Sequence, residues 1–207
     1  MIQIFSRCLS SVEYGVASVT AEGERESGDR HLVRSIPGGV LLAVVDGSGH
    51  GPDAAAAAQA AIGILESGPI EDLASLVHAC HERLKSLRGA VMSVATIRRV
   101  ANVLTWLGVG DIQGVLFRGG GAGPASETML QRPGVVGYRL PPLQTVATPI
   151  QPGDLLIVST DGIRANYGCD FSFEDQPQNI ADRISAGFRT GHDDGLVLVA
   201  RYLGEQE

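Results

Sequence analysis

The sequence predicts an α+β fold, a layered α-β-β-α sandwich in which two antiparallel sheets are flanked by helices. Segments rich in Val, Ile and Leu follow one another in runs, and the first two helical segments come as a pair instead of alternating with single strands. With 207 residues, of which 44% are hydrophobic and 19% charged, the chain is expected to form one globular domain over residues 1–207.

The first half of the chain is expected to contain four strands and two helices. The strands are apolar segments separated by polar or glycine-containing breaks, at residues 2–9, 13–20, 31–36 and 39–46. The first helix should run from about Pro52 to Glu66, because proline suits the first helical position, where its missing N–H is not needed. The second helix, within residues 70–87, has an apolar face formed by Leu73, Leu76, Val77, Cys80, Leu84 and Leu87.

Strand signals dominate the second half of the chain, at residues 90–99, 102–109, 112–118, 126–132, 144–150, 154–159 and 195–203. One helix is expected near residues 178–188, before the last strand. The glycine-rich loop 118–126 and the segment 131–143 are expected to face the substrate, because loops on a rigid sheet commonly carry specificity.

The composition of the chain indicates which kinds of partner the protein binds and where in the cell it is located. A formal net charge of -7 and a pI near 5.2 argue against binding to nucleic acid or to an anionic membrane, since both require clustered Lys and Arg. No segment approaches the roughly 20 apolar residues of a membrane span, and the N-terminus has no signal-peptide core. The cysteines, Cys8, Cys80 and Cys169, are widely spaced, so we expect no disulfide framework, no thiolate zinc site and a cytoplasmic location.

The segment "LLAVVDGSGHGPDAAAAAQAAIGIL", residues 41–65, joins an apolar strand to an alanine-rich helix through an aspartate, a histidine and three glycines. A dinucleotide-binding loop does not fit, because the glycines do not follow GxGxxG and Asp46 would repel a pyrophosphate. A nucleophile at Ser48 does not fit either, because a nucleophile elbow requires GxSxG. The third interpretation makes Asp46 a metal ligand, held rigidly at the end of a buried strand.

Such a site needs further carboxylates, and three occupy comparable places beside a strand end or turn: Asp29, Asp161 and Asp193. An apolar strand followed by Asp-Gly occurs twice, at residues 46–47 and 161–162. A turn residue or helix cap is the commoner role of each aspartate taken alone. Four of them together favour a metal site.

Four motifs carry a resemblance to a known family. "VVDGSGHGPDAA", "GVGD" at residues 108–111, "PGDLLIVSTDGI" and "DDGLVLVA" follow one another between Gly28 and Val199. They resemble the signatures of the metal-dependent protein phosphatases, the protein phosphatase 2C family, in the small bacterial SpoIIE-like branch. The resemblance implies the β-sandwich flanked by helix pairs that the strand and helix pattern predicts independently.

The resemblance also implies a ligand set for two divalent cations, Mn²⁺ or Mg²⁺. Asp46 would bridge the two ions, the carbonyl of Gly47 would bind one, and Asp161 and Asp193 would complete the other. Asp29 would act through metal-bound water. Asp194 matches the position after the last ligand and would support the loop. All-oxygen ligands of this kind select hard cations over zinc.

The implied reaction is hydrolysis of phosphoserine or phosphothreonine in a protein by a metal-activated water. The place directly after Asp-Gly, a histidine in eukaryotic relatives, is Ser48 here, with His50 two residues further on. His50 is a candidate general acid, and a structural role in the loop is the alternative. Arg25 and Arg30 flank Asp29 and are candidates for phosphate binding, against a solvated loop position. Asp111, in "GVGD", is read as a turn or hydrogen-bonding residue.

The size and motif style of the chain resemble the feedback phosphatases of that branch, which act on phosphorylated STAS-domain proteins of the stressosome. Two other classes of function stay open. One is a non-catalytic module that binds phosphoproteins, although such modules usually lose an aspartate that this chain retains. The other is a hydrolase of small phosphate esters.

Overall fold

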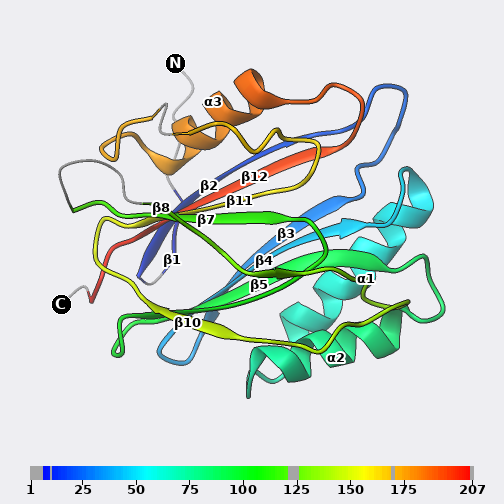
Figure 1. Cartoon of the computed structure of the whole chain (residues 1–207), viewed down its shortest axis with the longest axis horizontal. Coiled ribbons are helices and arrows are strands. Elements are labelled where there is room, and N and C mark those ends of the chain that lie inside the picture. The colour runs from blue at the N-terminus through cyan, green and yellow to red at the C-terminus, as the bar shows by residue number, and fades with distance from the viewer. Residues whose placement is uncertain (1–6, 10, 121–125, 169–170, 206–207) are drawn as a thin grey trace.

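The computed structural model describes residues 7–9, 11–120, 126–168 and 171–205. Its elements form four layers, with α3 over one sheet and with α1 and α2 over the other (Figure 1). This is the layered sandwich that the sequence predicts. Cys169 and most of the glycine-rich loop 118–126 lie outside the described residues. None of the helices in the described ranges is long and apolar enough to cross a membrane.

Over the described residues the first sheet contains six strands in the order β1-β2-β12-β11-β7-β8, and every neighbouring pair is antiparallel. In chain order its strands are β1 (Arg7–Leu9), β2 (Val12–Val19), β7 (Gln113–Phe117), β8 (Ser126–Thr128), β11 (Leu155–Ser159) and β12 (Gly195–Tyr202). Within the described residues β1 pairs only with residues 12–14 of β2. The side chain of Gln178 then bonds to both backbone groups of Val16, accepting from its N–H at 3.1 Å and donating to its C=O at 2.9 Å.

The second sheet follows the order β10-β6-β5-β4-β3, with β9 beside β6. In chain order its strands are β3 (Asp29–Ile36), β4 (Gly39–Gly47), β5 (Ala90–Arg98), β6 (Val103–Val109), β9 (Gln131–Arg132) and β10 (Val146–Pro149). The β6–β9 pair is parallel, which departs from the expected purely antiparallel sheets. The expected strand 126–132 is divided into β8 and β9, because the chain crosses there from the first sheet to the second.

The helices are α1 (Pro52–Ser67), α2 (Leu73–Leu84) and α3 (Pro177–Phe188). Asp72 caps α2 by accepting from the N–H of Ser75 at 2.8 Å. Leu87 was expected on the buried face of this helix, and that expectation is wrong. The helix ends at Leu84, and Leu87 is 36% exposed.

The main core lies between the two sheets. It contains alternate residues of β4 together with apolar residues of β11 and β12, and Trp106 is its largest fully buried side chain. The remaining residues of β4 face α1 and α2 in a second cluster. Both faces of β4 are therefore buried, which explains why its sequence is a continuous apolar run and does not alternate.

Candidate functional site

Five acidic residues lie at the same end of the sandwich, where strands of both sheets end or begin. Asp29 begins β3 and Asp46 lies near the end of β4, and the antiparallel register pairs the two residues directly. Asp161 follows β11, Asp193 precedes β12, and Asp111 follows β6. The acidic end, as we call these five residues, thus joins segments that are far apart in the sequence.

Three carboxylates of the acidic end, those of Asp29, Asp46 and Asp161, have a raised pKa. The pKa of Asp46 rises from the ordinary 3.8 to about 9, first because of burial and then because Asp29, Asp161, Asp193 and Asp111 are negatively charged neighbours. Burial is also the main reason that the pKa of Asp29 rises to about 7. The pKa of Asp161 is raised by burial, by Asp193 and by Asp111. Burial and mutual repulsion thus disfavour the ionised carboxylates, and a bound cation would offset this repulsion.

The chemistry of these donors fits hard divalent ions. Carboxylate and carbonyl oxygens are the ligands that Mg²⁺ and Mn²⁺ prefer. Among the described residues no three His, Cys, Asp or Glu side chains are grouped closely enough to hold one ion by themselves. Each ion would therefore depend on water and backbone oxygen as well, which is usual for Mg²⁺, since it keeps several waters when bound.

The two Asp-Gly pairs that follow an apolar run, Asp46-Gly47 and Asp161-Gly162, need their glycine for reasons of space. A Cβ on Gly47 would lie 2.0 Å from the carbonyl oxygen of Ala54 in α1. A Cβ on Gly162 would lie 1.8 Å from the carbonyl oxygen of Asp194. Each glycine lets a neighbouring segment pack directly against the strand end that carries an aspartate, so neither pair acts as a simple surface turn.

Two buried side chains hold the acidic end in place. The hydroxyl of Thr160 donates to Asp29 Oδ2 at 2.7 Å and accepts from the N–H of Leu196, which links the two sheets. The carboxylate of Asp194 accepts from the N–H groups of Ala21 and Gly28, at 2.7 and 2.6 Å. Asp194 therefore holds both ends of the loop 21–28.

The adjacent Asp193 is placed differently from Asp194. It is half-buried, and its Oδ1 accepts from the N–H of Asp194 at 2.8 Å. No backbone group outside the pair bonds to its carboxylate among the described residues, which leaves oxygen free for an ion.

His50 lies in the turn between β4 and α1 and is mostly solvent-exposed. Its side chain is 71% exposed, and Nδ1 lies 2.6 Å from Glu24 Oε1 on the loop 21–28. The same turn is tied to the segment before β5, because the N–H of Ser48 donates to the carbonyl of Gly89 at 3.0 Å. His50 therefore lies at the surface, four residues beyond Asp46 in the sequence and paired with a carboxylate.

The two arginines considered for phosphate binding have different surroundings. Arg25 is exposed on the loop 21–28. Arg30 is half-buried, and its Nη1 donates to the backbone carbonyls of Ser27 and Asp29, at 2.6 and 2.9 Å. Arg30 thus fixes the entry to β3.

Asp111 and Glu24 are not among the metal ligands or acid that the sequence predicts. Asp111 lies in a bend after β6, as expected of a turn residue, and its charge also contributes to the raised pKa of both Asp46 and Asp161. The "GVGD" motif was the available signal for it. Glu24 had no signal, because its contact with His50 depends on how two distant loops meet.

The segment 131–143 begins beside the acidic end. The carbonyl of Arg132 accepts from the N–H of Gly110, next to Asp111. Val136 pairs with Ala90. The residue before Ala90, Gly89, accepts the hydrogen bond from the N–H of Ser48 in the turn after Asp46. The expectation that this segment faces the substrate is consistent with these contacts and stays a prediction.

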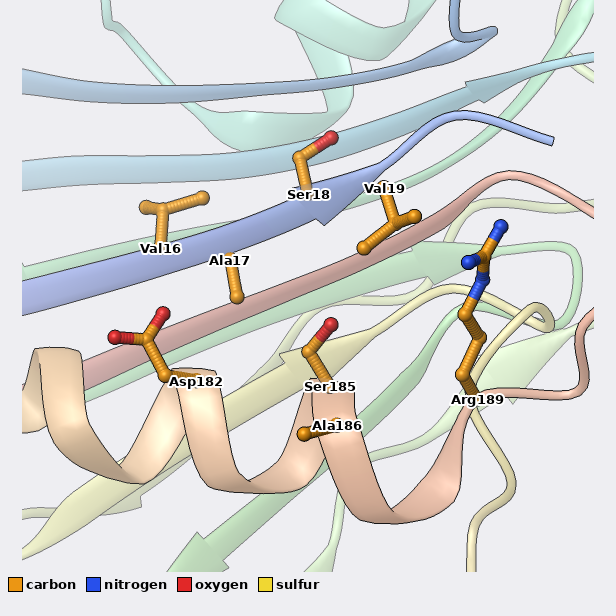
Figure 2. A pocket seen from close by; sticks show the side chains of 8 residues that line it. All are labelled: Val16, Ala17, Ser18, Val19, Asp182, Ser185, Ala186 and Arg189. Carbon is orange, nitrogen blue, oxygen red and sulfur yellow. The ribbon is translucent and has the colours of Figure 1, made fainter. Parts of the chain in front are cut away.

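A separate groove of about 540 Å³ lies between β2 and α3. Figure 2 shows Asp182 toward one end of the groove and Arg189 toward the other, with Ser18 and Ser185 between them. None of the acidic residues of the candidate site lines it. Hollow shape alone therefore does not locate the candidate site, which is defined by its charges.

Comparison with known proteins adds independent information. The family model described as stage II sporulation protein E (SpoIIE) matches residues 36–203. The phosphoserine phosphatase RsbX of Bacillus subtilis (strain 168) is 25% identical over 150 residues, which are 72% of this chain and 73% of RsbX.

Solved structures agree with this match. One structure comes from work on the bacterial stressosome as a modular system that has been adapted to control secondary messenger signalling. It is 32% identical in sequence with a TM-score of 0.84, and the match covers 92% of this chain and 99% of the other. RsbX in complex with magnesium has the same fold, with a TM-score of 0.81 at 21% identity, over 92% of this chain and 95% of RsbX. The chain therefore belongs to the SpoIIE family of protein phosphatases of the 2C type, metal-dependent hydrolases that act on phosphoserine and phosphothreonine.

Proposed function

We propose that this phosphatase acts as an RsbX-like feedback regulator, removing phosphate from serine or threonine of STAS-domain stressosome proteins in the cytoplasm. Its similarity to RsbX and to a stressosome structure supports this substrate class. In this proposal residues 1–207 act as a single phosphatase domain. The observation that carries the catalytic part is the acidic end, where Asp46 has a pKa of about 9 because of burial and unneutralised neighbours.

Within this proposal each aspartate has a defined task at two divalent cations, Mn²⁺ or Mg²⁺. Asp46 would hold both ions, the Gly47 carbonyl would hold one, and Asp161 and Asp193 would hold the other. Asp29 would bind through an intervening water, and its hydrogen bond to Thr160 keeps its carboxylate in place. When bound, such ions supply positive charge for the phosphate dianion and lower the pKa of water.

Other residues of the chain would hold the metal-binding aspartates in position. Asp194 is committed to two backbone N–H groups, so it supports the ligand beside it without itself facing an ion. The two Asp-Gly glycines allow α1 and the turn before β12 to pack tightly against the strand ends. This packing limits movement of Asp46 and Asp161, and a fixed geometry is what in-line attack on phosphorus requires. His50 would donate a proton to the leaving serine or threonine oxygen.

The test combines activity with direct ion binding. Phosphate release from a phosphorylated STAS-domain protein would be measured with Mn²⁺, with Mg²⁺ and with chelator, for the native chain and for Asp46→Asn. We expect the variant to lose at least about 100-fold in kcat, and calorimetry to show weakened Mn²⁺ binding. Glu22→Gln makes the same chemical change at an exposed carboxylate and serves as control.

The substrate class is tested separately from the site. The native chain should hydrolyse the phosphorylated STAS-domain protein with a higher kcat/KM than an unrelated phosphopeptide. Equal values for the two substrates would contradict the stressosome role and leave the phosphatase activity standing. Full activity of Asp46→Asn with unchanged Mn²⁺ binding would contradict the ligand assignment.

A further inference from the structure

We propose that Glu24 is a positioning residue for His50, orienting the imidazole so that Nε2 can protonate the serine or threonine oxygen that leaves phosphorus. This inference rests on the proposed phosphatase site and adds to it the device that orients its acid. It starts from a contact between two loops, 2.6 Å between His50 Nδ1 and Glu24 Oε1.

The contact with Glu24 determines the roles of the two ring nitrogens of His50. An ionised carboxylate can only accept hydrogen bonds, so Nδ1 must carry the proton that is shared with Glu24. The same arrangement orients catalytic and metal-binding histidines generally, because the partner of one ring nitrogen fixes the role of the other. No other hydrogen bond engages the imidazole among the described residues, and its side chain is 71% exposed. Nε2 is therefore available to a bound substrate.

Glu24 is held more firmly than His50. Its side chain is only 26% exposed. A Cβ on Gly51 would lie 3.0 Å from Glu24 Oε2, so the glycine that precedes α1 makes room for the carboxylate. Gly51 also has a φ of 76°, a conformation that favours glycine. Negative charge is favourable at this position, because the N-terminus of a helix carries a partial positive charge.

The loop that carries Glu24 is attached to the proposed ligand turn. Asp194 accepts from the N–H of Ala21 and of Gly28, and it directly follows the proposed ligand Asp193. A turn within the loop, from the N–H of Glu24 to the carbonyl of Ala21 at 3.2 Å, directs Glu24 toward His50. The loop 21–28 thus fixes His50 relative to the acidic end, although His50 itself lies at the surface.

The reaction explains why orientation matters. The oxygen of a water forms a bond to phosphorus while the ester P–O bond breaks, and the electron pair of that bond stays on the serine or threonine oxygen. This oxygen takes the proton from His50 Nε2. The proton released by the attacking water passes to solvent, from which the imidazole regains one, so that the enzyme ends unchanged. An alkoxide is a poor leaving group and needs this proton, whereas a nitrophenolate leaves readily without it.

The experiment compares two substrates whose leaving groups differ in this need. kcat/KM is measured on a phosphoserine peptide and on p-nitrophenyl phosphate, for Glu24→Ala, His50→Ala and the double variant. We expect the ratio of the peptide value to the aryl value to fall about tenfold in Glu24→Ala and about 100-fold in His50→Ala. The double variant should have the same ratio as His50→Ala, because Glu24 acts only through His50.

Two exposed carboxylates on the same loop, Glu22 and Glu26, provide matched controls. Glu22→Ala and Glu26→Ala remove the same charge and should keep the native ratio. An equal fall on both substrates in Glu24→Ala would assign Glu24 a purely structural role and overturn the proposal. So would losses that multiply in the double variant, or an unchanged ratio in His50→Ala. Asp46→Asn tests the proposed metal site separately from the role of Glu24. Loss of activity on both the peptide and p-nitrophenyl phosphate in that variant supports the metal site, whatever the result for Glu24.

Discussion

The adjacent residues Asp193 and Asp194 should respond in opposite ways to the same chemical change. Each is replaced by asparagine, which keeps the shape of the side chain and removes its charge. Asp194 is 4% exposed, and its two oxygens accept from two backbone N–H groups. An amide has only one acceptor oxygen, so Asp194→Asn leaves one of these N–H groups facing an NH₂ group.

The magnitude follows from that lost acceptor. A buried N–H group without a partner costs about 1–3 kcal/mol, and the remaining bond loses its charge assistance. We therefore expect Asp194→Asn to lower the free energy of unfolding by about 2 kcal/mol, which corresponds to roughly 4–8 °C in Tm for a chain of this size. Asp193→Asn retains the oxygen that accepts from the N–H of Asp194 and removes charge from the acidic end. Its metal-free stability should equal or exceed the native value.

The assay is urea unfolding in chelator, followed by circular dichroism, together with calorimetric titration of Mn²⁺. Asp194→Asn should show the lower unfolding midpoint, and Asp193→Asn the larger loss of Mn²⁺ affinity. Native stability of Asp194→Asn would refute the assigned role of its two hydrogen bonds. A stability loss in Asp193→Asn as large as in Asp194→Asn would refute the distinction between ligand and support.

Three further predictions concern the same region. Gly47→Ala places a Cβ 2.0 Å from the carbonyl oxygen of Ala54, so the free energy of unfolding measured in urea should fall by about 1–3 kcal/mol, and an unchanged urea midpoint would contradict the close packing. The pKa values of about 7 for Asp29 and about 9 for Asp46 mean that between pH 4 and 9 the folded chain holds protons that the unfolded chain has released. In chelator, Tm should therefore fall as the pH rises from 5 to 8, and saturating Mg²⁺ should reduce this dependence of Tm on pH. A Tm that rises with pH in chelator would contradict the raised pKa values of the two aspartates. Asp111→Asn should weaken Mn²⁺ binding about tenfold by calorimetry, whereas an unchanged Kd would separate Asp111 from the site.

Local patterns of the sequence predict the elements whose residues carry a complete signal. The apolar run of β4 and the proline-started helix α1 end within one residue of the predicted bounds. The division of residues 126–132 into β8 and β9 was not predicted, because the partners of these strands lie in different sheets. A local pattern contains the strand signal and no information about the partner.

The same limit applies to the candidate site. Asp29, Asp46, Asp161 and Asp193 could be selected because each stands at a strand end within a motif, and the raised pKa of Asp46 reflects all three others. Glu24 has no motif, and its role depends on a contact across 26 positions of sequence. Asp111 has a motif, but its charge matters only because the end of β6 lies near the end of β4 in its own sheet and the end of β11 in the other.

The hydrogen bonds between Gln178 and Val16 have a consequence for behaviour at high concentration. A strand edge with free N–H and C=O groups can recruit a strand from another molecule and start aggregation. The amide of Gln178 occupies one such pair of groups on β2, just beyond the residues that β1 covers. Gly15 lets α3 approach this strand, because a Cβ there would lie 2.2 Å from the backbone nitrogen of Gln178. A single side chain from a helix thus imitates a neighbouring strand and discourages edge-to-edge association between copies of the protein.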